Sequence, residues 1–130
     1  MPIYKAMKIS AGELLILNKT FGDLMEKELP AKLAFRLAAY ANKISPELQA
    51  AVSQHQKIMS RYAVETKPGV QEIRPDKMGD FLAVHDEFQK TTVEISSLDL
   101  TMEELETIPT LTVAQAAILS KVINDATRTQ

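Results

Sequence analysis

The chain has 130 residues, of which 45% are hydrophobic and 25% charged, and its net charge is −2. This size predicts one domain, residues 1–130, with a core that needs neither disulfides nor a structural metal. The absence of cysteine excludes disulfides, thiol chemistry and cysteine-ligated zinc or iron–sulfur sites. No apolar run reaches the roughly 20 residues that a membrane span needs, and we expect a cytoplasmic protein.

The N-terminal segment predicts a short extended piece followed by a helix. Residues 3–9 permit an edge strand or a loose arm, and these two alternatives stay open. Ser10 and Glu13 have the spacing of a capping box, which predicts a helix start. The apolar positions that follow at helical spacing are Leu14, Leu17, Phe21 and Leu24. We expect Gly22 to mark the close approach of another helix, and Pro30 to end this element.

The longest helical pattern spans residues 30–62. Its apolar positions recur at steps of three or four: Leu33, Leu37, Ala41, Ile44, Leu48, Val52, His55, Met59 and Tyr62. Pro46 conflicts with this pattern, because proline inside a helix costs about 3 kcal/mol, and Ser45 before it resembles an N-cap. Since the apolar stripe keeps its phase through Pro46, we predict one long helix kinked near residues 42–46 rather than two helices with a turn.

The second half of the chain predicts shorter elements. Residues 67–69 (Lys-Pro-Gly) are a turn signal, and residues 70–73 and 93–95 have strand-like composition. A helix after Pro75 places Met78, Phe81, His85, Phe88 and Thr92 on one face. Two more capping boxes predict a short helix and a last helix, and they are formed by Thr101 with Glu104 and Thr112 with Gln115. In the last helix, the side chains that we expect to face the core are Ala116, Leu119, Val122 and Ile123.

These elements define the expected fold class. It is mainly α, with a long kinked central helix packed against three or four shorter helices, and it leaves room for one small two-stranded β element.

His55 and His85 are the only histidines, and both lie on the apolar faces of predicted helices. They lie on different helices and, with Asp86 or Glu87 nearby in sequence, offer ligands for a metal-assisted enzyme. However, two ligands do not make a site, and no HExxH motif is present. We interpret both as core or boundary histidines, and we expect no metal, no cofactor and no catalytic residue.

A basic row marks one face of the central helix. Lys32, Arg36 and Lys43 share this face, and together with Arg61 and Arg74 they are the candidate binding residues. We do not expect a nucleic-acid reader, because the chain is acidic overall, has few aromatic residues and carries no recognition motif. Residues 76–130 hold four basic and ten acidic side chains. This acidic half is the natural complement of the basic row, within the chain or in a second copy.

The order of elements resembles that of a family of small, uncharacterised helical proteins of tailed bacteriophages and prophages. The likeness is one of layout over most of the chain. Its parts are Pro30-Ala31-Lys32-Leu33-Ala34, a long helix to Gln56 and Arg61-Tyr62, a Pro/Gly turn, the segment from Phe81 to Phe88, the stretch from Val93 to Leu100, and a Leu/Ile-rich last helix. The resemblance implies a non-catalytic protein that binds a host or viral protein, as a host-defence inhibitor or an assembly factor.

We also expect a homo-oligomer, because the long helix carries more apolar surface than the short elements cover. Two alternatives stay open. One is a protein that binds or sequesters a small nucleotide signal, held between subunits by Arg36, Arg61 or Arg74. The other is the metal-assisted enzyme that uses His55 and His85.

Overall fold

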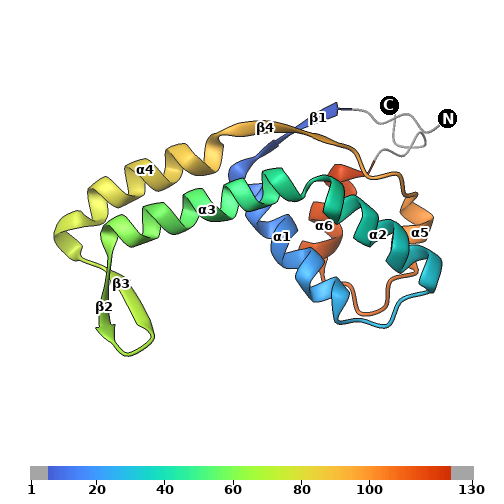
Figure 1. Cartoon of the computed structure of the whole chain (residues 1–130), viewed down its shortest axis with the longest axis horizontal. Coiled ribbons are helices and arrows are strands. Elements are labelled where there is room, and N and C mark those ends of the chain that lie inside the picture. Colours follow the sequence, from blue (N-terminus) through green and yellow to red (C-terminus); the bar gives the residue numbers. More distant parts are fainter. Residues whose placement is uncertain (1–5, 124–130) are drawn as a thin grey trace.

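The computed structural model describes residues 6–123 and is mainly helical, as predicted (Figure 1). Its elements are β1 (Ala6–Ser10), α1 (Ala11–Met25), α2 (Ala31–Lys43), α3 (Ser45–Tyr62), β2 (Ala63–Lys67), β3 (Val70–Ile73), the 3-10 turn η1 (Pro75–Lys77), α4 (Met78–Lys90), β4 (Thr92–Ser96), α5 (Met102–Glu106) and α6 (Val113–Val122). Figure 1 shows two parts. In the arm, residues 52–90, the outer part of α3 runs antiparallel to α4 and the β2–β3 hairpin forms the end. The remaining described residues form the body.

The three predicted capping boxes are present. The Ser10 hydroxyl accepts a hydrogen bond from the Glu13 backbone N–H at 3.1 Å, and the Glu13 carboxylate accepts one from the Ser10 N–H at 3.0 Å. The same reciprocal pairs open α5, with Thr101 and Glu104, and α6, with Thr112 and Gln115. Each box satisfies two backbone donors that the first helical turn leaves without a partner, so these helices begin where the sequence predicts.

The predicted continuous helix over residues 30–62 is two helices, α2 and α3, with Ile44 alone between them. Backbone hydrogen bonding continues on both sides, since Ile44 donates to the Tyr40 carbonyl and accepts from the Leu48 N–H, each at 3.1 Å. Pro46 lies in the first turn of α3, where its missing N–H costs nothing. The change of direction therefore falls within the predicted segment 42–46, as an interruption of one residue.

The core lies in the body. Its largest fully buried side chains are Ile9, Leu14, Leu17, Leu24, Leu37, Ile44, Leu98, Leu100, Leu119 and Val122. Tyr40 is also buried, and its hydroxyl donates to the Ser96 carbonyl at 2.7 Å, which joins α2 to β4. Burial raises the pKa of Tyr40 well above its ordinary value, so the phenol stays a neutral donor.

The strands form two separate antiparallel pairs. β1 pairs with β4, from Ala6 opposite Ser96 to Ser10 opposite Thr92, and β2 pairs with β3 through the predicted turn, in which Gly69 has φ +80°. At the end of α4, the Thr91 carbonyl accepts a hydrogen bond from the Ala11 N–H at 2.7 Å. The long-range β1–β4 pair thus joins the base of the arm to the start of α1.

The close helix approach occurs at Gly12 and not at the predicted Gly22. A Cβ at Gly12 would lie 3.4 Å from the Gln89 Cβ of α4, whereas a Cβ at Gly22 would meet nothing within 4 Å. Gly22 lies on the exposed face of α1, so its small size serves no contact there. Every helix among residues 6–123 is too short or too polar to be a membrane span.

Candidate functional site

The arm differs from the body in how little it buries. None of the side chains of α4 is buried, and the buried residues of α3, Leu48 and Ala51, precede the arm. The predicted apolar stripe is buried at Leu33 and Leu37 but only half-buried at Val52 and beyond. Helices that make few buried contacts have the lowest free energies of local opening in a protein. The arm therefore has the least buried packing of the described fold.

Aromatic and histidine rings hold the two arm helices together, and we call them the ring ladder. The ring centroids lie 6.0 Å apart for Tyr62 and Phe81, 5.1 Å for Phe81 and His85, 5.5 Å for His85 and His55, and 6.0 Å for His55 and Phe88. A Phe–Tyr pair such as Phe81 with Tyr62 contributes about 0.5–1.5 kcal/mol beyond its buried area. The ladder thus supplies specific packing between helices that lack a closed core.

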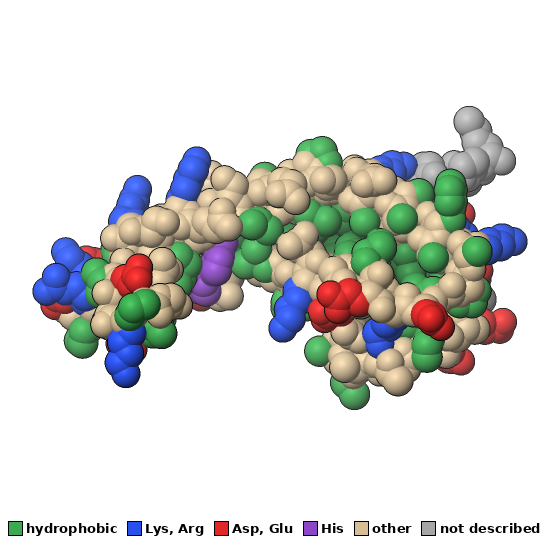
Figure 2. All heavy atoms as spheres, turned by 60° about the horizontal axis from the view of Figure 1, so that its bottom comes forward, with side chains coloured by type: hydrophobic (Ala, Val, Ile, Leu, Met, Phe, Trp, Pro, Cys, Tyr) green, Lys and Arg blue, Asp and Glu red, His purple; other side chains and the backbone are tan. Residues whose placement is uncertain are grey.

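The two histidines are half-buried, as expected of boundary residues, and the fold brings them into contact. Burial lowers the pKa of His55, and the nearby His85 lowers it further. Figure 2 shows histidine side chains (purple) at the surface, between the end of the arm and the body, beside apolar side chains (green). Among residues 6–123, no group of three or more His, Asp or Glu side chains is arranged to hold a metal ion.

A surface groove of about 470 Å³ runs along one flank of the arm. It is lined by Ala11, Gln54, Lys57, Ile58, Arg61, Val84, Glu87, Phe88 and Thr91. Four of these residues are apolar, while Lys57 and Arg61 of α3 and Glu87 of α4 supply opposite charges. A groove of this composition suits a chain segment or a small anion that meets the two cations.

Four apolar side chains of the arm remain largely exposed. They are Leu82 at 55%, Val70 at 41%, Val64 at 40% and Met78 at 38%. Two of them belong to α4 and two to the hairpin, so they extend over the outer part of the arm. Scattered exposed apolar residues are common, but these four lie on α4, β2 and β3, none of which contains a buried side chain.

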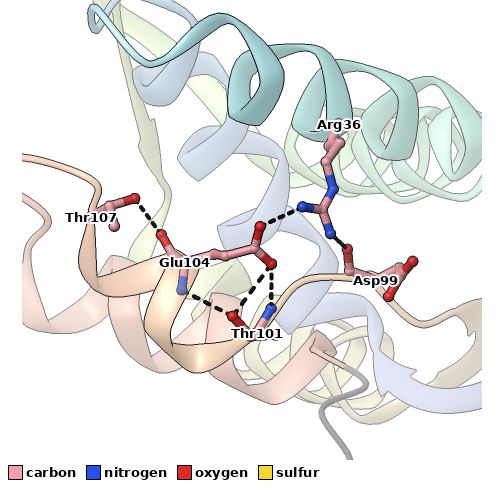
Figure 3. Close-up of polar contacts among 5 residues, drawn as sticks. All are labelled: Arg36, Asp99, Thr101, Glu104 and Thr107. Atoms are coloured by element: carbon pink, nitrogen blue, oxygen red, sulfur yellow. Dashed lines mark hydrogen bonds and ion pairs between the residues drawn. The ribbon is translucent and has the colours of Figure 1, made fainter.

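Arg36 is engaged inside the body (Figure 3). Its guanidinium pairs with Glu104 at 2.5 Å and also donates to the Asp99 carbonyl. The Thr101 backbone N–H and Arg36 hold the pKa of Glu104 below its ordinary value, against the opposing effect of burial. The basic row thus finds part of its acidic complement within the same chain, where it joins α2 to α5.

The five predicted binding residues do not form one site. Lys32 is exposed on the first turn of α2, and Lys43 lines a hollow of about 210 Å³ that Arg36 also borders. Arg61 lines the arm groove, whereas Arg74 pairs with Asp76 at 3.3 Å near the end of the arm. Only Lys32, Arg36 and Lys43 were predicted to share a helix face, and Arg61 and Arg74 lie apart from them in the arm.

The sequence prediction also missed the exposed Phe35, Lys57 as a groove residue, and the ring ladder as a unit. Phe35 is 76% exposed on α2 and borders the 210 Å³ hollow. The ladder residues were all assigned to apolar helix faces, but helical spacing does not say which two faces meet.

No family model, no curated protein and no solved structure matches this chain.

Proposed function

We propose that the protein acts by binding another protein through its arm and performs no catalysis. The observation that carries this proposal is the lack of any fully buried side chain on α4, together with the exposure of Met78, Leu82, Val64 and Val70. Two helices and a hairpin that do not bury an apolar face are stabilised when a second surface covers them. The arm is then the docking element and the body its rigid support.

The charge of the arm favours a protein as the partner. Residues 52–90 carry six basic and six acidic side chains, so the arm has no net charge. Nucleic acids and anionic membranes are bound by an excess of positive charge, which the arm lacks. A mixed pattern around apolar residues suits a protein surface, including a second copy of the same arm. We therefore propose a homo-oligomer in which paired arms pack as helices do in a bundle.

The layout resemblance to phage proteins supplies the proposed setting. In the cytoplasm of an infected host cell, a binding protein of this size acts by occupying a host-defence component or by helping virion proteins assemble. The arm would present the same docking surface in either case. Identification of the partner by co-purification, with an arm variant as the control, distinguishes the two settings.

Light scattering on the untagged chain, combined with size-exclusion chromatography, tests the docking role of the arm. We expect a defined oligomer that dissociates in Leu82→Asp, because a buried carboxylate without a partner is costly. The matched control is Val113→Asp, since Val113 is 89% exposed but lies at the start of α6 in the body. A monomer at all accessible concentrations, or an oligomer that Val113→Asp dissociates while Leu82→Asp does not, would contradict the proposal.

A second candidate function is the binding of a small anionic ligand, such as a nucleotide signal, in the arm groove. The observation that favours it is the presence of Lys57 and Arg61 along one wall of the 470 Å³ groove. Arg36 does not fit this role, because Glu104 and the Asp99 carbonyl already occupy its guanidinium. The test is a thermal shift with nucleotides that disappears in Arg61→Ala but persists in Lys32→Ala. Equal shifts in both variants would remove this candidate.

A further inference from the structure

We propose that His55 and His85 together bind one divalent transition-metal ion across the arm. His55 lies on α3 and His85 on α4, and their ring centroids are 5.5 Å apart. The chain contains no other histidine and no cysteine, so the full set of its imidazole and thiol ligands meets at this one point. Imidazole is the ligand that zinc, copper and nickel ions share. This inference is independent of the proposed docking function.

The distance between the rings fits a shared ion. Zinc–nitrogen bonds of about 2.0–2.1 Å place the centres of two imidazoles on a tetrahedral ion roughly 5 Å apart. The observed separation of 5.5 Å, with an angle of 64° between the ring planes, is close to that arrangement. Small rotations of the two side chains, within the broad χ2 range of histidine, bring one nitrogen of each ring to the ion.

The imidazole nitrogens are available for an ion. Among the described residues, the interactions of both histidines are ring contacts, with Phe81, Phe88 and each other, and neither imidazole hydrogen-bonds to another side chain or to the backbone. Figure 2 shows histidine side chains at the surface, which provides an entry path from solvent.

The ligand set determines which ions fit. No third His, Asp or Glu completes a site in residues 6–123, and the neighbouring Asp86 pairs with Lys90 at 2.9 Å. Two protein ligands make neither a closed structural site nor a three-ligand catalytic site, so water fills the remaining coordination positions and the ion is held weakly and exchanges readily. Magnesium and calcium prefer oxygen ligands, so this site selects Zn²⁺, Ni²⁺ or Cu²⁺ against them.

Binding of such an ion would clamp the arm. The ion links α3 to α4 at the middle of the ring ladder, where the rest of the packing is half-buried. A ligand that binds only the closed arm lowers the open population by the factor 1 + [L]/Kd, which is about tenfold at ten times Kd. The arm should therefore become resistant to local opening when zinc is present.

Calorimetric titration of the untagged chain with zinc chloride tests the site. We expect one ion per chain, loss of this binding in both His55→Gln and His85→Gln, and no response to magnesium chloride. The matched control is Gln56→Ala, an exposed position adjacent to His55 on α3, which should bind zinc like the original chain. Electron paramagnetic resonance with one equivalent of Cu²⁺ should show two nitrogen ligands, reduced to one or none in each histidine variant.

Limited trypsin digestion separates ligand loss from unfolding. Lys57, Arg61 and Lys77 are cleavage positions in the arm, and zinc at ten times Kd should slow their cleavage about tenfold in the original chain and in Gln56→Ala. The histidine variants lose ring contacts, so their arm should be cleaved somewhat faster than that of the original chain, and zinc should leave their cleavage rate unchanged. Zinc binding that survives in both histidine variants, or no binding at millimolar zinc, would overturn the proposal.

Discussion

The body and the arm contain helices of similar length but stabilise them in different ways. In the body, α1 and α2 bury leucines such as Leu17 and Leu37 completely, at about 1.5–3 kcal/mol each. In the arm, α4 buries none of its side chains and makes ring contacts with α3 through Phe81 and Phe88. The comparison teaches that one stripe of apolar residues along α2 and α3 is buried in the core at one end and only half-buried, against α4, at the other.

The largest expected effect lies in the body. Leu37→Ala removes a fully buried side chain from α2 and should reduce the free energy of unfolding by about 2–5 kcal/mol, because it leaves a cavity. Urea denaturation followed by circular dichroism measures the loss. An effect below about 1 kcal/mol would contradict the assignment of the core to the body.

The second effect should be confined to the arm. Phe81→Ala removes the contacts of Phe81 with Tyr62 and His85, and we expect it to lower the free energy of local opening by about 1–1.5 kcal/mol. Amide hydrogen exchange should then accelerate roughly tenfold in α4, with the slowest amides of α1 unchanged. Equal acceleration in both helices would mean that arm and body unfold as one unit.

A smaller effect should appear with pH. The pKa of His55 is lower in the folded arm than in an unfolded chain, so its neutral form stabilises the arm above the unfolded value of about 6.5. This stability is lost as the pH falls through the folded pKa, because the open arm binds the proton more tightly. The amide hydrogen exchange rates of the arm, corrected for the intrinsic pH dependence of amide exchange, should rise as the pH is lowered from 7.5 to 5.5. His55→Gln should remove most of this rise, and an unchanged rise would contradict the role of His55.

The smallest effect concerns the ion pair of the body. Arg36→Ala should cost about 0.5–1 kcal/mol, since its partner Glu104 is partly exposed and water screens the pair. The lowered pKa of Glu104 means that its contribution is present above the unfolded carboxyl pKa and disappears as the pH falls through the folded value. Denaturation of the original chain and the variant should show a larger difference at pH 7 than at pH 3, where the hydrogen bond from Arg36 to the Asp99 carbonyl remains.

Local signals predicted much of the fold, since the capping boxes at Ser10, Thr101 and Thr112 and the leucine spacing of α1 depend on neighbouring residues alone. The pairing of β1 with β4 was not predictable, because strand composition does not name a distant partner. The apolar stripe of residues 30–62 keeps its helical phase past Pro46, and this pattern is compatible with a kinked helix and with two helices separated by one residue. The backbone conformation of Ile44, which is not helical, distinguishes the two. The contact of His55 with His85 likewise depends on which helix faces meet.

The most direct test of the central claim is amide hydrogen exchange, read by mass spectrometry, of the untagged chain across a range of protein concentrations. The account predicts fast exchange in α4 and the outer part of α3 at low concentration, and protection of these segments as the oligomer forms, with exchange in α1 and α2 unchanged. Arm amides that are protected like those of α1 at the lowest concentration, or concentration-dependent protection confined to the body, would contradict it.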